Sequence, residues 1–160
     1  MKIAILLATA TLGVAGAQAA SAAIQTSNMS ASAEVSTVCT MDSTPLAFGE
    51  VALTGATSGT ATVHVTCTDG GEYTVGLNDG LHGAAGQRNL MSGLNSLAYD
   101  LFKEVGHANR WGDASDELVS GTGTALEQSL TVYGQVASGQ TLVAGNGDLY
   151  TDTVQVTVTY

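Results

Sequence analysis

The chain has 160 residues, 20 glycines, one proline and a formal net charge of −10. This length allows one domain with a buried core and leaves no room for a second domain. Only three basic residues follow Lys2, so the surface cannot neutralise a run of phosphates, and nucleic acid and anionic lipid are excluded as expected partners.

An export signal is predicted over residues 1–19. One basic residue is followed by a short apolar run that fades into small residues, and Ala17 and Ala19 frame a cleavage site. Cleavage there starts the mature chain at Ala20, and cleavage after Ala22 is the alternative. No later apolar run reaches the roughly 18 to 20 residues that span a bilayer, so we expect export without membrane insertion.

Residues 20–32 form a stretch of small and polar side chains between the export signal and a first strand, which is predicted over residues 33–40. Such a stretch is typical of a flexible N-terminal tail. It is also compatible with a strand that pairs with another molecule. Both interpretations stay open on the residues alone.

Cys39 and Cys67 are the only two cysteines of the chain. Two cysteines of a small exported domain pair in an oxidising compartment, so the sequence predicts a Cys39–Cys67 disulfide. Two thiols can also bind a metal ion, but neither has a second cysteine or a histidine at ligand spacing. The disulfide is therefore the preferred interpretation.

The rest of the chain alternates apolar and polar residues in short runs, the pattern of antiparallel strands. The first clear strand covers residues 60–67 and buries one face. A turn over 69–71 leads to a second run over 73–77, and the two runs are expected to form a hairpin. Glycine-rich connections separate the runs, which indicates an all-β domain. Further strands are predicted over 97–102, 129–136 and 153–160.

The sequence offers no arrangement of side chains that calls for catalysis. The separations between His64, His82 and His107 match no local metal motif. Asp113 and Asp116 lie in a short polar loop, where solvation explains them better than an acid–nucleophile pair or a calcium loop. Neither a Gly-x-Ser-x-Gly motif nor a phosphate-loop lysine is present. We therefore expect no catalytic residues, no metal site and no cofactor.

Short motifs follow one another in a fixed order along the mature chain: Cys39-Thr40, Phe48-Gly49, Val65-Thr66-Cys67, Gly71-Glu72-Tyr73-Thr74-Val75, Arg88-Asn89-Leu90-Met91, Leu97-Ala98-Tyr99-Asp100-Leu101-Phe102, Trp111-Gly112, Leu130-Thr131-Val132-Tyr133-Gly134 and Tyr150-Thr151-Asp152-Thr153-Val154-Gln155-Val156-Thr157-Val158. Single motifs are weak, whereas their order and spacing are specific. Together they resemble the spore coat protein U family, which includes the subunits of archaic chaperone-usher pili.

The resemblance implies an all-β, incomplete immunoglobulin-like sandwich over residues 33–160 that lacks its last strand. In such families a periplasmic chaperone first fills the open groove, and a donor strand from a neighbouring subunit then replaces it. Residues 20–32 are the implied donor segment. Ile24 and Met29 have opposite parity, so the register of that strand stays open. The implied donor residues are Ala20, Ala22, Ile24, Thr26, Asn28 and Met29, and the implied acceptor residues are Val154, Val156, Val158 and Tyr160.

The function that the resemblance implies is that of a structural subunit of an extracellular adhesive pilus. Its expected partners are neighbouring subunits, a periplasmic chaperone and an outer-membrane usher, and the fibre would serve surface attachment and biofilm formation. A structural protein of a spore or cell coat with the same fold is one alternative. A monomeric secreted binding module, whose N-terminal segment folds back into its own groove, is another.

Overall fold

The structure is a computed structural model that describes residues 21–51, 54–141 and 149–160. The predicted export signal and Ala20 lie outside these residues. Residues 21–34 belong to a first unit of the chain, and every one of them is exposed and outside any strand. The second unit, Val35–Tyr160, carries all eight strands of the described chain.

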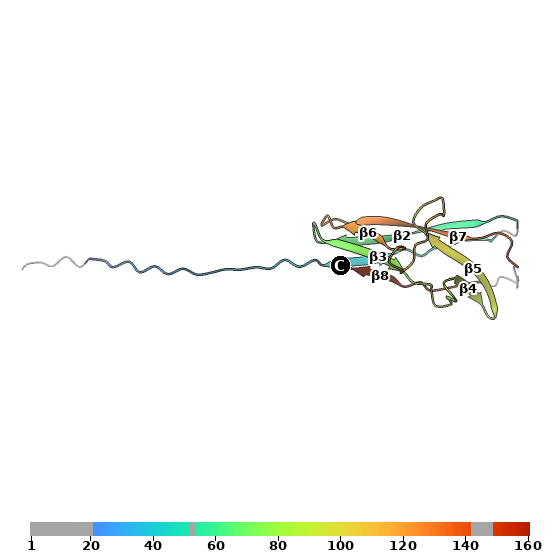
Figure 1. The fold of residues 1–160 in the computed structure, drawn as a ribbon, viewed down its shortest axis with the longest axis horizontal. Helices are drawn as coiled ribbons and strands as arrows, with labels where there is room; N and C mark the ends of the chain where they lie inside the picture. Colours follow the sequence, from blue (N-terminus) through green and yellow to red (C-terminus); the bar gives the residue numbers. More distant parts are fainter. Residues whose placement is uncertain (1–20, 52–53, 142–148) are drawn as a thin grey trace, which may run out of the picture. The chain divides into compact units, whose positions relative to one another are not determined.

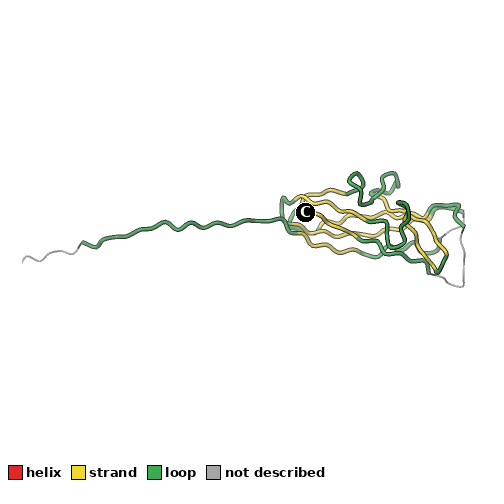
Figure 2. The backbone as a smooth tube through the Cα atoms, turned by 60° about the horizontal axis from the view of Figure 1, so that its bottom comes forward, coloured by secondary structure: helices red, strands yellow, loops and turns green. Residues whose placement is uncertain are grey.

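The second unit is a sandwich of two antiparallel sheets (Figure 1). One sheet has five strands in the order β1-β2-β7-β5-β4, and the other has three in the order β6-β3-β8. Among the described residues there is no helix (Figure 2), and hence none of the length and apolarity that crossing a membrane requires. The strands are β1 (Cys39–Ser43), β2 (Thr57–Cys67), β3 (Glu72–Leu77), β4 (Arg88–Ser92), β5 (Asn95–Phe102), β6 (Val119–Thr122), β7 (Gln128–Val136) and β8 (Val156–Thr159).

The core lies between the two sheets, because each strand directs alternate side chains inward. Trp111, from the connection between β5 and β6, is 1% exposed and completes the core. Its indole Nε1 donates a hydrogen bond to the carbonyl of Val75 over 3.0 Å, so the buried polar atom is paired. The buried apolar residues are Val63, Val65, Cys67, Tyr73, Val75, Leu77, Leu97, Tyr99, Leu101, Trp111, Val132 and Val136.

Most of the predicted strands are confirmed within a few residues. The runs predicted over 60–67, 73–77, 97–102 and 129–136 correspond to β2, β3, β5 and β7. The run predicted over 153–160 contains the shorter β8, because the residues before Val156 bond to β4 and to the loop after β3. Alternation does not predict β4 or β6, which are only five and four residues long.

The predicted hairpin between residues 60–67 and 73–77 is wrong. β2 pairs with β1 and β7 in the larger sheet, whereas β3 pairs with β6 and β8 in the smaller one. The turn between them crosses from one sheet to the other, with Gly70 at a φ of +75° that favours glycine. Alternation identifies the buried face of a strand but not the neighbour with which it pairs.

The first strand begins later than predicted. β1 starts at Cys39 rather than at residue 33, so most of the predicted run is outside a strand. The preceding residue is fixed by Thr68, whose backbone N–H donates to the Val38 carbonyl over 3.0 Å. The predicted disulfide is confirmed, since Cys39 and Cys67 face each other across β1 and β2 and are bonded. The N-terminal end of the sandwich is therefore held covalently.

Candidate binding groove

An open groove of about 320 Å³ runs between the two sheets. It is bordered by the chain that follows β1 and by β8 with the residues before it, and β1 and β8 are both edge strands. Unpaired sheet edges beside an apolar strip form a natural place for a further strand. The lining residues are Ser43, Thr44, Pro45, Leu46, Phe48, Ala61, Thr62, Val63, Leu77, Leu90, Tyr99, Leu101, Val132, Asp152, Val154 and Val156.

The border after β1 is shaped by Pro45, the only proline of the chain. Pairing with β2 extends through Thr44 and ends there, because proline has no backbone N–H to donate. Leu46 and Phe48 then pack half-buried against the core. Gly134 leaves room for them, since a Cβ at that position would lie 2.8 Å from Leu46 Cδ1 and 3.0 Å from Phe48 Cε1. These two side chains occupy part of the interior and narrow the groove.

The border formed by β8 carries backbone groups that point away from the rest of the sheet. The carbonyls of Thr153 and Gln155 accept hydrogen bonds from the loop that follows β3. Neighbouring residues of a strand direct their N–H and C=O groups to opposite edges, so the backbone groups of Val154, Val156 and Val158 point to the free edge. This border therefore offers a row of donors and acceptors to an incoming strand.

One part of the groove wall is polar. The Asp152 side chain is 1% exposed, and its carboxylate accepts a hydrogen bond from the Tyr99 hydroxyl over 2.8 Å. Its other oxygen lies 3.1 Å from the backbone N and from the ring Nδ1 of His82. Gly80, at a φ of +83°, makes room for this carboxylate, because a Cβ there would collide with it. Burial, and next the bond to Asp152, raise the pKa of the Tyr99 hydroxyl well above its ordinary value.

The raised pKa of Tyr99 predicts a loss of stability at high pH. The folded chain keeps the hydroxyl proton where the unfolded chain releases it, so this contribution is complete below about pH 10 and is lost as the pH rises further. Between pH 10 and 11 the free energy of unfolding should fall by up to about 1.4 kcal/mol from this group. Tyr99→Phe should remove that component, as measured by urea unfolding at a series of pH values.

Tyr160→Phe is the matched control, because Tyr160 is 59% exposed and takes no part in this cluster. This variant keeps the hydrogen bond between Tyr99 and Asp152, so it should retain the fall in stability that Tyr99 contributes. An equal slope for Tyr99→Phe and the unchanged chain would show that Tyr99 does not hold its proton more tightly in the folded state.

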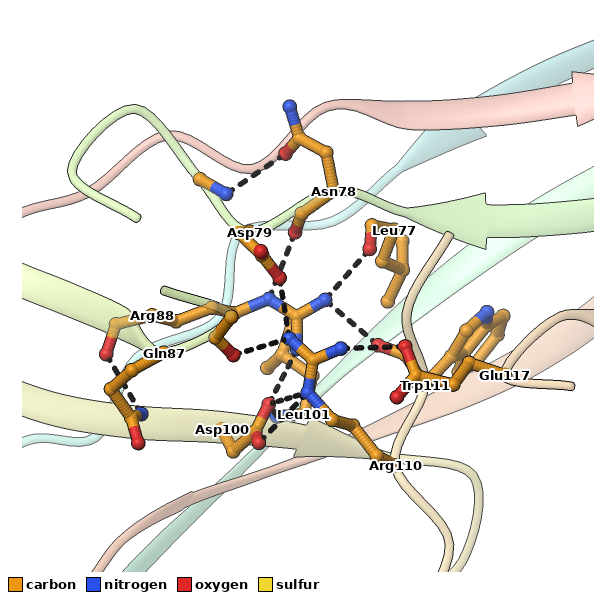
Figure 3. Close-up of polar contacts among 12 residues, drawn as sticks. Leu77, Asn78, Asp79, Gln87, Arg88, Asp100, Leu101, Arg110, Trp111 and Glu117 are labelled. Atoms are coloured by element: carbon orange, nitrogen blue, oxygen red, sulfur yellow. Dashed lines mark hydrogen bonds and ion pairs between the residues drawn. The ribbon is translucent and has the colours of Figure 1, made fainter. Parts of the chain in front are cut away.

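A buried arginine fixes the groove wall at Leu77. The Arg88 side chain is 0% exposed and donates from Nε to the Asn78 carbonyl over 2.9 Å and from Nη2 to the Leu77 carbonyl over 2.7 Å. Further bonds reach the Trp111 carbonyl from Nη2, over 2.8 Å, and Asp100 from Nη1, over 2.5 Å. Leu77 and Asp100 belong to different sheets, so Arg88 ties the two sheets together (Figure 3).

Arg110 lies beside Arg88 and holds three carboxylates (Figure 3). Its Nε is 3.0 Å from Asp100, its Nη1 is 2.6 Å from Glu117 and its Nη2 is 2.5 Å from Asp79. Burial lowers the pKa of Arg88. For Arg110 burial acts in the same direction, but the bonds and charges of the three carboxylates outweigh it and raise the pKa. The carboxylates thus allow two guanidinium groups to lie next to each other inside the protein.

The three histidines lie in three different surroundings. His64 is 3.1 Å from Glu127, His82 contacts Asp152, and His107 is 3.1 Å from the side-chain amide of Gln135. Within residues 21–51, 54–141 and 149–160, no three His, Cys, Asp or Glu side chains are grouped closely enough to hold a metal ion.

The predicted acceptor residues have different positions relative to the groove. Val154 and Val156 line it, Val158 packs half-buried against the core, and Tyr160 is exposed and outside the lining. The predicted donor residues within 22–29 are all exposed in the first unit of the chain. Their role as a donor strand stays a prediction.

The sequence alone indicates no role for Leu46, Phe48 or Asp152, which line the groove. Two apolar side chains at alternate positions directly after a proline are a signal that could have placed Leu46 and Phe48 in the interior. No local signal marks Asp152, because its partners Tyr99 and His82 are 53 and 70 residues away in the sequence.

Fold and groove together define a class, a two-sheet β-sandwich with an apolar groove between two edge strands. Residues 25–157 match the family model of the Spore Coat Protein U domain, and the chain therefore belongs to that family. The resemblance inferred from the sequence motifs is thus confirmed. Proteins of this pilin-like family are structural and generally not enzymes.

A solved structure with the same fold is the crystal structure of the CsuC–CsuE chaperone–tip adhesion subunit pre-assembly complex, from the archaic chaperone-usher Csu pili of Acinetobacter baumannii. The matching chain is 26% identical, with a TM-score of 0.59. The match covers 79% of this chain and 40% of that one, so this chain spans less than half of the length of its relative. No curated protein sequence matches the chain.

Proposed function

We propose that this chain is a structural subunit of an extracellular adhesive pilus, assembled by the chaperone-usher pathway and serving surface attachment and biofilm formation. In the assembled fibre, the N-terminal segment of a neighbouring copy fills the groove. The observation that carries the proposal is an apolar groove between two edge strands, in a chain whose residues 21–34 are exposed and outside any strand.

A donor strand stabilises the sandwich in two ways. Its backbone pairs with the free edge of β8, and its side chains remove the apolar lining of the groove from water. Before assembly, a periplasmic chaperone covers the same groove, and an outer-membrane usher then passes the subunit to the growing fibre at the cell surface. Completion of the fold and assembly of the fibre are one event.

The proposal predicts that residues 21–34 are needed for self-assembly but not for folding. Expressed in a periplasm with a matching chaperone, the full exported chain should form polymers and a 1:1 chaperone complex. A variant lacking residues 21–34 should form the chaperone complex alone, because the deletion removes no residue that lines the groove. Size-exclusion chromatography with light scattering distinguishes these species.

A stable monomer that is indifferent to the deletion would contradict the proposal and favour a monomeric binding module. Electron microscopy of expressing cells distinguishes the remaining alternative. Fibres that extend from the cell support a pilus, whereas an even surface layer that contains the chain would favour a coat protein of the same fold.

A further inference from the structure

Residues 29–36 have the pattern of a strand without being in one. Apolar Met29, Ala31, Ala33 and Val35 alternate with polar or charged side chains at the even positions. Strict alternation of this kind is typical of a strand with one buried face. Yet the first strand begins only at Cys39, and Met29 and Val35 are 92% and 84% exposed.

We propose that the segment Met29–Val35 of a second copy of this chain fills the groove, with its odd-numbered side chains turned to the groove floor. This inference rests on the proposed function. It adds which residues form the donor strand and which of their side chains face the groove. Of the donor residues implied by the family resemblance it keeps Met29, and it moves the strand toward the C-terminal end of the N-terminal segment.

Length and side-chain size fit the groove. On the border formed by β8 and the residues before it, Asp152, Val154 and Val156 line the groove, and the free edge continues through Val158, so the seven residues of Met29–Val35 can pair along it. At a rise of about 3.3 Å per residue, the two strands can therefore run side by side over their full length. Leu46 and Phe48 already occupy part of the interior. Small side chains such as those at positions 31 and 33 suit the space that is left.

The charge of Glu34 determines which face of the segment can turn toward the groove. Glu34 is the only charged residue between positions 21 and 38, and it lies on the polar face of the segment. A shift by one residue would turn its carboxylate into a groove whose only charged lining residue is Asp152, also an acid. Burying an unpaired carboxylate beside another is strongly unfavourable, so the alternation permits only the odd-numbered face.

An alternative donor strand with Ile24 on its inward face fits the groove less well. In that frame the positions that follow Ile24 on the same face are Thr26 and Asn28. Their polar groups would have to leave water at a floor that includes the apolar Val63, Leu77 and Val132, which is less favourable than burying the small apolar side chains at positions 31 and 33. Ile24 lies outside the paired segment in the proposed arrangement.

The test places one charge on either face of the segment in the full exported chain, coexpressed with the chaperone. Ala31→Asp and Ala33→Asp should each reduce polymer formation at least about a hundredfold, because the new carboxylate would be buried without a cation. Ser30→Asp and Ser32→Asp add the same charge to the solvent face and should change polymer formation by no more than about twofold. Light scattering after size exclusion measures the polymer.

The 1:1 chaperone complex reports on folding, and all four variants should retain it because these residues are exposed in the free chain. Polymer lost in the serine variants and kept in the alanine variants would overturn the assigned face. Equal behaviour of all four variants, while the chain lacking residues 21–34 forms no polymer, would overturn the assigned segment and leave the proposed function standing. Polymer from that deletion variant would instead overturn the proposed function.

Discussion

Replacing Arg88 by methionine is expected to lower the free energy of unfolding by about 3 to 5 kcal/mol. The guanidinium is 0% exposed and donates to the carbonyls of Leu77, Asn78 and Trp111 as well as to Asp100. Methionine fills a similar space but leaves three carbonyls without these donors. A buried carbonyl that loses its hydrogen-bond donor still carries its full desolvation free energy, and nothing compensates for it.

Urea unfolding followed by the fluorescence of Trp111, the only tryptophan, measures this change directly. Lys103→Met is a suitable control, since the Lys103 ammonium donates only to the carbonyls of Asp116 and Leu118 near the surface. The control should cost no more than about 1 kcal/mol. A loss of the same small size for Arg88→Met would show that apolar packing replaces the arginine network without penalty.

Removing the Cys39–Cys67 disulfide is expected to lower the free energy of unfolding by about 3 to 4 kcal/mol. The bond joins residues that are 28 positions apart, and opening it releases that loop in the unfolded chain. The effect on the folded side is local, because β1 is only five residues long and is an edge strand. Unfolding of the Cys39→Ala, Cys67→Ala double variant, compared with the oxidised chain, measures the loss.

Treatment with a reductant is the control for the predicted effect of the disulfide. It should lower the stability of the unchanged chain to that of the double variant and should leave the double variant unaffected. Equal stability of the oxidised chain and the double variant would mean that the hydrogen bonds between Thr68 and Val38 hold this end of the sandwich without the disulfide.

Local alternation was sufficient to predict the strands that supply most of the core. The run from Thr60 to Cys67 shows its buried face in the sequence because every second side chain is apolar. The same signal could not show that β2 and β3 belong to different sheets. Which strands become neighbours depends on the edges that remain free elsewhere in the chain, and that information is not local.

The groove could be predicted only in part. The family resemblance implies Val154 and Val156 as acceptor residues, and both line the groove, while their role as acceptors stays a prediction. Its opposite border depends on Pro45, which ends a ladder, and on Gly134, which leaves space 89 residues further along the chain. The arginine network is equally non-local, because Arg88 bonds carbonyls from two separate connections. Such pairings appear only when the chain is folded.

In the proposed fibres, the arginine network limits which charges remain for contacts between neighbouring fibres. Arg88 and Arg110 bind carbonyls and carboxylates of their own molecule, and Lys103 binds two of its carbonyls. Every lysine and arginine of the described residues is thus engaged within its own chain, while the chain as a whole carries a net charge of −10. The proposed fibres should therefore repel one another when they lie side by side, over a distance set by the salt concentration, about 8 Å at physiological ionic strength. Bundles should therefore form only when salt or a multivalent cation is added, and single fibres should predominate in dilute buffer.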